Sequence, residues 1–65
     1  MNGSIISWND ANGRGLVNGT HLVVRSNCTQ RLQDELEGKA IPPDGSVAVT
    51  FDEGPAGDAI NVDLR

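Results

Sequence analysis

The stretch "GSIISWNDANGRGLV", residues 3–17, decides the fold of this chain. An apolar, β-branched run over residues 3–9 ends at an Asn-Asp pair, which is typical of a strand. Turn-forming residues follow at 10–13, and an extended run resumes at 14–17. A glycine within such a run often marks a close backbone approach. The stretch therefore predicts two strands, and Gly15 raises the question of what Arg14 and Leu16 face.

A third strand follows directly. "NGT" at 18–20 is a strong hairpin signal, and "HLVVR" at 21–25 is the strand that it predicts. Alternation along a strand divides these side chains between two faces, with Leu22 and Val24 on one face and with His21, Val23 and Arg25 on the other.

The pattern changes after this third strand. Cys28, Leu32 and Leu36 recur at four-residue spacing, which predicts a short helix that ends at Gly38. Asn27 and Gln30 resemble a capping box at its start. The acidic residues of this segment are expected to form a solvated face: Asp34, Glu35 and Glu37. Two prolines in "AIPPDG", residues 40–45, then end any helix.

Two further strands close the chain. "SVAVTFD" at 46–52 and "AINVDL" at 59–64 alternate, and a glycine-rich hairpin loop joins them. The side chains expected to point inward are Val47, Val49 and Phe51 from the first strand, and Ile60, Val62 and Leu64 from the second. Strands grouped three then two predict an all-β fold: a five-stranded antiparallel OB-type Greek-key barrel with a short helical turn in the connection between the third and fourth strands. An SH3-like barrel also fits this strand count. Residues 1–65 are expected to form one domain.

Charge and cysteine content restrict the function classes. The net charge of −4 argues against holding nucleic acid by bulk electrostatics. Residues 1–31 nevertheless carry +2, and residues 32–65 carry −6, so the first half can present a basic face. One cysteine allows no internal disulfide and no zinc set, and no apolar run reaches the ~20 residues of a membrane span. We expect a cytoplasmic protein with no metal, no cofactor and no membrane partner.

Catalytic patterns are missing as well. His21 and Cys28 are each single, and we expect a surface histidine and a small packed cysteine. The acidic residues are spread without paired spacing, and the glycines of "NGRGLV" at 12–17 lack the Lys-Ser/Thr of a phosphate loop. The chain is therefore not expected to be an enzyme.

Residues 3–17 are similar to the opening of bacterial cold-shock proteins, in which Gly-Thr-Val-Lys-Trp-Phe-Asn leads into Lys-Gly-Phe-Gly-Phe-Ile. "HLVVR" stands where that family has Val-Phe-Val-His, and "GSVAVTFDEGPAGDAINVDL" at 45–64 resembles the closing hairpin of the family. The resemblance implies a cold-shock-like OB-type barrel that binds single-stranded RNA or DNA, with a regulatory role. In that family aromatic rings on the second and third strands stack on bases.

Most of those rings are replaced in this chain. Ser7 stands at the position of the stacking Trp, and Trp8 at the neighbouring Phe. Arg14 and Leu16 stand at the two Phe positions of the first motif. The nucleic-acid-binding positions that the resemblance implies are Trp8, Asn12, Arg14, Leu16, Val23 and Arg25. Of these, only Trp8 offers a ring for stacking, and because the chain has two aromatic residues, a core role for Trp8 is as open as a binding role.

Two hypotheses follow from this loss. If each of four lost rings contributed ~1 kcal/mol, binding would weaken by ~4 kcal/mol, about a thousandfold, so we expect weak binding of single-stranded RNA or DNA in which Arg14 and Arg25 partly compensate. The alternative is a protein-interaction module that no longer binds nucleic acid. In that case a patch of Leu16 and Val23, rimmed by the two arginines, contacts a partner protein or a second copy of the chain.

Overall fold

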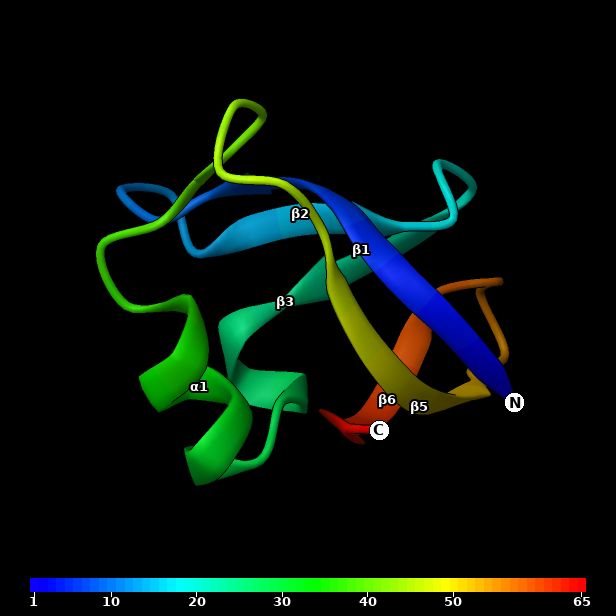
Figure 1. Ribbon diagram of the computed structural model, residues 1–65. Coiled ribbons are helices and arrows are strands. Elements are labelled where there is room, and N and C mark those ends of the chain that lie inside the picture. The colour runs from blue at the N-terminus through cyan, green and yellow to red at the C-terminus, as the bar shows by residue number, and fades with distance from the viewer.

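A computed structural model describes residues 1–65, and every predicted strand forms (Figure 1). The first three strands and the closing pair lie where the sequence pattern places them: β1 (Asn2–Asn9), β2 (Arg14–Val17), β3 (His21–Val24), β5 (Val47–Glu53) and β6 (Ala59–Leu64). A single turn of 3-10 helix, η1 (Arg25–Asn27), and a short helix, α1 (Gln30–Leu36), follow β3. The prediction of an all-β fold with one helical segment is confirmed.

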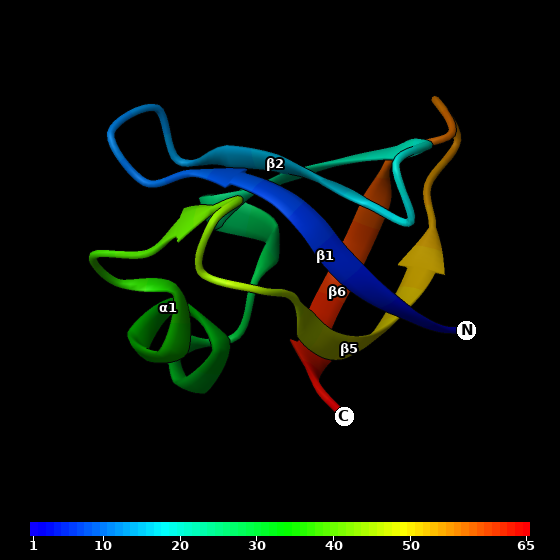
Figure 2. The same cartoon turned by 45° about the horizontal axis from the view of Figure 1, so that its top comes forward.

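The sheet is antiparallel and strongly curled, with strand order β3-β2-β1-β5-β6. β1 lies between β2 and β5, so the long connection after β3 returns the chain beside the first strand, as in a Greek key. The result is an OB-type barrel that α1 covers at one end (Figure 2). Sequence analysis missed one element, the two-residue strand β4 (Ala40–Ile41), which pairs with the end of β1.

The turn between β2 and β3 forms as predicted. Asn18 and Gly19 both have positive φ, 55° and 76°, which the Asn-Gly sequence accepts with little strain. Asn18 also ties the turn to β1, because its N–H donates to the Ser4 carbonyl at 2.8 Å and its Oδ1 accepts from the Ser4 N–H at 3.0 Å. The turn conformation and these two hydrogen bonds to β1 together fix the register of the hairpin.

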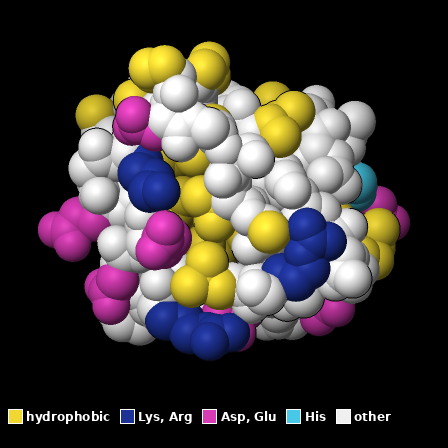
Figure 3. All heavy atoms as spheres, in the orientation of Figure 1, with side chains coloured by type: hydrophobic (Ala, Val, Ile, Leu, Met, Phe, Trp, Pro, Cys, Tyr) yellow, Lys and Arg dark blue, Asp and Glu magenta, His cyan; other side chains and the backbone are white.

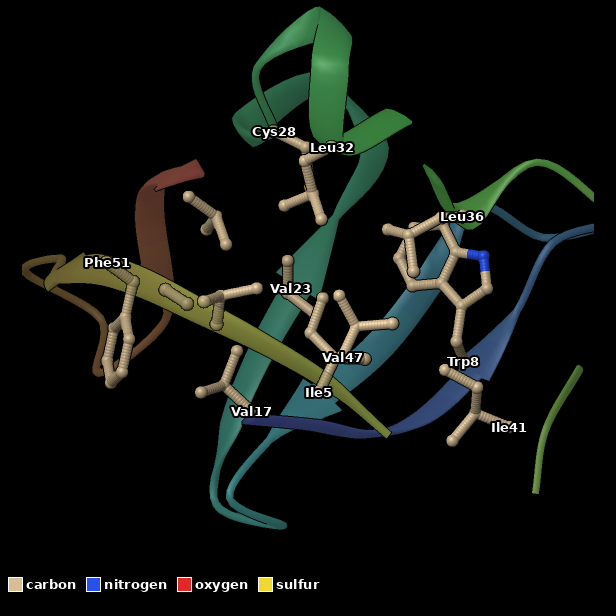
Figure 4. Close-up of a cluster of buried hydrophobic side chains, with 13 residues drawn as sticks. Ile5, Trp8, Val17, Val23, Cys28, Leu32, Leu36, Ile41, Val47 and Phe51 are labelled. Atoms are coloured by element: carbon tan, nitrogen blue, oxygen red, sulfur yellow. The ribbon is translucent and has the colours of Figure 1, made fainter. Parts of the chain in front are cut away.

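The core is built mainly from aliphatic residues of the strands (Figure 4). Val47, Val49 and Phe51 point inward from β5 as predicted. The prediction for β6 is wrong in part, because Ile60 and Leu64 are only half-buried, whereas Ala59 and Val62 are fully buried. A positive φ of 50° at Asn61 and a register shift between β5 and β6 break the simple alternation of this strand.

Helix α1 packs Leu32 and Leu36 into the core, as the four-residue spacing predicts. Its N-cap is Thr29, whose hydroxyl accepts a hydrogen bond from the Leu32 N–H at 3.4 Å, so the predicted capping box at Asn27 is wrong. Residues 25–27 instead form η1, so the cap of the helix lies two residues later than predicted. Gly38 has a φ of 76° just beyond the helix, as predicted for its end.

A polar clamp joins the start of α1 to β6. Arg31 Nε donates to Asp63 Oδ1 at 2.8 Å, and the Thr29 hydroxyl donates to the same oxygen at 2.6 Å. The Arg31 guanidinium, followed by the Thr29 hydroxyl, lowers the pKa of the Asp63 carboxyl to about 2. The clamp therefore holds α1 over the end of the barrel at neutral pH.

Candidate binding surface

The outer face of β1, β2 and β3 is the surface on which the sequence places its candidate binding residues. Leu16 lies opposite Ser7 on one side and opposite Leu22 on the other, and Arg14 lies opposite Asn9 and Val24. Cross-strand partners share a face of a sheet, so these side chains all point away from the core. We call Leu16, Leu22 and Val24 the aliphatic row.

The exposure of the aliphatic row is uneven. Leu22 is 46% exposed, whereas Leu16 and Val24 are half-buried beside it. Ile6, also 46% exposed, lies close by because a bulge in β1 between Ile5 and Ser7 turns it outward, toward Gly19 in the β2–β3 turn. Such a group of exposed aliphatic side chains on one sheet face is a feature of contact surfaces.

Val23 does not belong to this surface. It is fully buried, so the prediction of an exposed Leu16 and Val23 patch is wrong for Val23. The physical reason is register, because the three residues of the β2–β3 turn place Leu22 and not Val23 opposite Leu16. A shift of one residue moves every side chain of a strand to the other face. Leu22 and Val24 occupy the outward positions that the resemblance assigned to their neighbours.

Trp8 is also in the core, with only 3% of its surface exposed. Its indole points into the same cluster as Leu36 from α1 and Ile41 from β4 (Figure 4), and its Nε1 donates to Asp10 Oδ1 at 3.4 Å. Gly15 faces it across the hairpin, where a side chain would meet the ring and the Ser7 carbonyl. Of the two roles left open for Trp8, the structure has the core role, and the binding role is wrong because a buried ring presents no free face for stacking.

The two candidate arginines differ sharply in their surroundings. Arg25 donates to the Asp10 carboxylate at 3.0 Å and to the Asp10 carbonyl, and it packs over Gly13. A carboxylate of the β1–β2 turn, outside the strands that carry the two arginines, thus neutralises Arg25. The Arg14 side chain is exposed on the outer face and makes no hydrogen bond or ion pair. Only Arg14 offers a free cationic group beside the aliphatic row.

Asp10 joins three segments of the chain behind this face through hydrogen bonds. Its carboxylate accepts from the Gly38 N–H at 3.1 Å as well as from Arg25 and Trp8. The Gly38 hydrogen bond, which contributes most, and those from Arg25 and Trp8 lower the pKa of the Asp10 carboxyl. A polar hollow of about 330 Å³ lies between Asp10, Arg25 and α1. Acidic side chains gather on this side of the molecule (Figure 3).

Asn12 lies exposed in the β1–β2 turn. Its backbone N–H donates to Asn9 Oδ1 at 3.2 Å, which is a turn-forming bond within the loop. Asn12 is therefore an accessible residue of the turn that precedes Arg14.

His21 and Cys28 have structural partners. Cys28 is buried, its Sγ donates to the Val24 carbonyl at 3.4 Å, and burial raises the pKa of its thiol to about 11. His21 is half-buried, packs on Phe51 and bonds Glu53 at 2.9 Å. No group of three His, Cys, Asp or Glu side chains is close enough to hold a metal ion.

No helix in the structure combines the length and the apolar character that a membrane crossing requires. No family model, no curated protein and no solved structure matches this chain. The likeness to cold-shock proteins rests on the quoted residues.

Proposed function

We propose that this chain is a protein-interaction module that binds its partner through the outer face of β1, β2 and β3. The observation that carries the proposal is the aliphatic row, Leu16, Leu22 and Val24, with an unpaired arginine next to it. Aliphatic side chains gain free energy when a partner removes them from water, roughly 25 cal/mol per Å² buried. An arginine at the margin of such a patch adds orientation and specificity.

The chemistry of this face favours protein over nucleic acid. Both aromatic residues of the chain, Trp8 and Phe51, are buried, so no ring on the outer face can stack on a base. Such stacking contributes roughly 1–3 kcal/mol per base in single-strand binding. The net charge of −4 also repels a phosphate backbone over distances comparable with the Debye length.

Capture from a nuclease-treated lysate of the native cells tests the proposal. The wild-type chain, Leu22→Asp and Ala56→Asp serve as three baits, since Ala56 is exposed in the β5–β6 loop and takes the same change in charge. We expect a specific protein on the wild-type and Ala56→Asp baits and at least a roughly tenfold loss on Leu22→Asp. Equal capture by all three baits would contradict the proposal, provided that thermal unfolding shows each bait to be folded.

Weak binding of single-stranded RNA or DNA is the second candidate, with a regulatory role. Its support is the exposed and unpaired Arg14 on the outer face of an OB-type barrel. A titration of ¹⁵N-labelled protein with short oligonucleotides at low salt tests it through the amide shifts of Arg14 and Leu16. Shifts that disappear in Arg14→Ala would favour this candidate, whereas unchanged spectra at millimolar oligonucleotide would remove it.

A further inference from the structure

Thr20, His21 and Glu53 form a continuous chain of hydrogen bonds between the β2–β3 turn and the end of β5. Thr20 Oγ1 lies 2.9 Å from His21 Nδ1, and His21 Nε2 lies 2.9 Å from Glu53 Oε2. Glu53 is 32 residues from His21 along the chain, so the fold and not the local sequence brings the carboxylate to the ring. A hydroxyl, an imidazole and a carboxylate joined in this order are the groups of an activated nucleophile.

The Glu53 carboxylate fixes which ring nitrogen of His21 carries the proton. An ionised carboxylate only accepts hydrogen bonds, so His21 Nε2 must donate to it. In the neutral imidazole the other nitrogen, Nδ1, then has a free electron pair, and the Thr20 hydroxyl donates to that pair. Nδ1 is therefore placed to take the proton from the Thr20 oxygen when this oxygen attacks an electrophile.

The base is held in place while the hydroxyl remains accessible. Only 17% of the His21 side chain is exposed, and its ring packs on the buried ring of Phe51, with 5.3 Å between the ring centroids. Thr20, in contrast, is exposed at the end of the β2–β3 turn. A reagent in solution can thus reach the Thr20 residue without entering the core.

Thr29 shows why Thr20 differs from the other hydroxyl residues. Thr29 is also exposed, and its hydroxyl donates to Asp63 Oδ1 at 2.6 Å. Hydrogen bonds from Arg31 and then Thr29 lower the pKa of the Asp63 carboxyl to about 2, so this carboxylate is a poor proton acceptor. Because His21 is the one histidine of the chain, Thr20 is the hydroxyl residue that an imidazole can activate.

Shape and charge restrict the electrophile to a small, neutral acyl compound. The one hollow of the molecule lies between Asp10, Arg25 and α1, so Thr20 has no cavity that could hold a large substrate. The Glu53 side chain is 56% exposed and the chain has a net charge of −4, which disfavours anionic donors such as acyl phosphates. An activated ester, with an uncharged acyl group and a good leaving group, meets both conditions.

We propose that Thr20 is an acyl-acceptor site, at which an activated ester acylates the hydroxyl with His21 as general base and Glu53 as positioning residue. This inference goes beyond the proposed function and does not depend on it. The Thr20 oxygen forms a bond to the acyl carbon, and its proton passes to His21 Nδ1. The bond from the acyl carbon to the leaving group breaks, the leaving group takes the electron pair, and the proton on Nδ1 passes to it or to water. The products are an ester of Thr20 and the free alcohol, with the imidazole neutral again.

Acetylation by p-nitrophenyl acetate at about pH 8, at which imidazole groups are neutral, tests the inference. Peptide mapping by mass spectrometry measures the rates at Thr20 and Thr29 in the same molecules, so their ratio requires no variant. We expect Thr20 to be acetylated roughly a hundredfold faster than Thr29. Equal rates at the two hydroxyls would overturn the inference.

Variants test the two supporting residues. His21→Gln keeps a polar side chain but removes the base, so the rate at Thr20 should fall to the rate at Thr29. Glu53→Gln should lower the rate at Thr20 at least roughly tenfold. Asp52→Asn is its matched control, because it removes the same charge from the preceding residue of β5 and should leave the rate unchanged. The ¹⁵N spectrum of the His21 ring should show the Nε2–H form in the wild type and a mixture of both forms in Glu53→Gln.

Thermal unfolding establishes which variants are folded. In folded protein, undiminished acetylation of Thr20 in His21→Gln would exclude His21 as the base. Equal rates in Glu53→Gln and Asp52→Asn, or an unchanged ring spectrum, would exclude Glu53 as the positioning residue. If a variant does not fold, the ratio of the rates at Thr20 and Thr29 in the wild type still decides whether the hydroxyl is activated.

Discussion

Replacement of Gly15 by alanine tests whether this barrel needs glycine there because a side chain would not fit, and not because the backbone is left-handed. A Cβ at Gly15 would lie 2.0 Å from the Ser7 carbonyl oxygen and 2.9 Å from Trp8 Cε3, although the backbone there is not left-handed. The first contact falls about 1 Å below the 3.0 Å that real Cβ atoms respect. Because the obstacle is backbone, β1 and β2 must move apart, and this disturbs the ring of Trp8.

The magnitude follows from the small size of the domain. Overpacking of this kind costs about 1–3 kcal/mol, and a rigid backbone obstacle belongs at the upper end, so we expect a loss of about 3 kcal/mol. A 65-residue domain has a free energy of unfolding of roughly 3–10 kcal/mol. Gly15→Ala should therefore remove a third or more of the stability.

Urea unfolding followed by Trp8 fluorescence measures this loss, because Trp8 is the one tryptophan of the chain. With a slope of about 1 kcal/mol/M, the midpoint should fall by about 3 M. Gly38→Ala is the matched control, since Gly38 has a φ of 76° with no atom within 4 Å of the added methyl. The control should lose about 1–2 kcal/mol from backbone strain alone. A midpoint for Gly15→Ala within about 1 M of wild type would refute the steric reasoning.

Three further predictions concern the core, the clamp and the helix cap. Trp8→Ala should lose about 3–5 kcal/mol of stability, measured by circular dichroism in urea, whereas a surface ring would lose less than about 1 kcal/mol. The Asp63 carboxyl has a pKa of about 2 in the folded protein against its ordinary 3.8, so its contribution to stability is complete above about pH 4 and disappears as the pH falls through 2. Asp63→Asn should make the free energy of unfolding depend less on pH in that range. The same loss of stability at acid pH as in the wild type would contradict the clamp. Thr29→Ala should cost about 1 kcal/mol, measured by thermal unfolding; no loss would argue against Thr29 as the cap of α1.

The strands were predictable because each carries a local signal. The Asn18-Gly19 pair demands positive φ, which only a few residue types accept, and the alternation of Val47, Val49 and Phe51 has a period of two. Both signals lie within a few residues of the structure that they specify. The sequence accordingly predicts the number of long strands, their order and the helical segment.

The inward and outward faces were harder to predict where the chain departs from regular alternation. Resemblance places Val23 on the surface, but the length of the β2–β3 turn determines that Leu22 lies there instead. In β6, the positive φ of Asn61 reverses the alternation. Asparagine accepts this conformation more readily than most residues, but a single asparagine inside an alternating run does not by itself predict a bulge. These outcomes depend on register between strands, and register is a property of the pair that one strand does not contain.

Partners of the charged groups could not be predicted from local sequence either. Asp10 and Arg25 are 15 residues apart, and they meet because the β1–β2 turn folds over the end of β3. Arg14 has no such partner, because its neighbours across the sheet are Asn9 and Val24. Charge counted along the sequence treats the two arginines alike, whereas the fold neutralises one and leaves the other free.

The scarcity of aromatic residues links the fold to the function proposed for this face. The core draws on Trp8 and Phe51, the two aromatic residues of the chain, and otherwise on smaller aliphatic side chains. Turning Trp8 outward to stack on a base would leave a cavity that costs about 3–5 kcal/mol, a large fraction of a stability of roughly 3–10 kcal/mol. The chain cannot both fold stably and present this ring. The proposed recognition on the outer face therefore uses its aliphatic row and Arg14, and these groups suit a protein surface better than a stacked base.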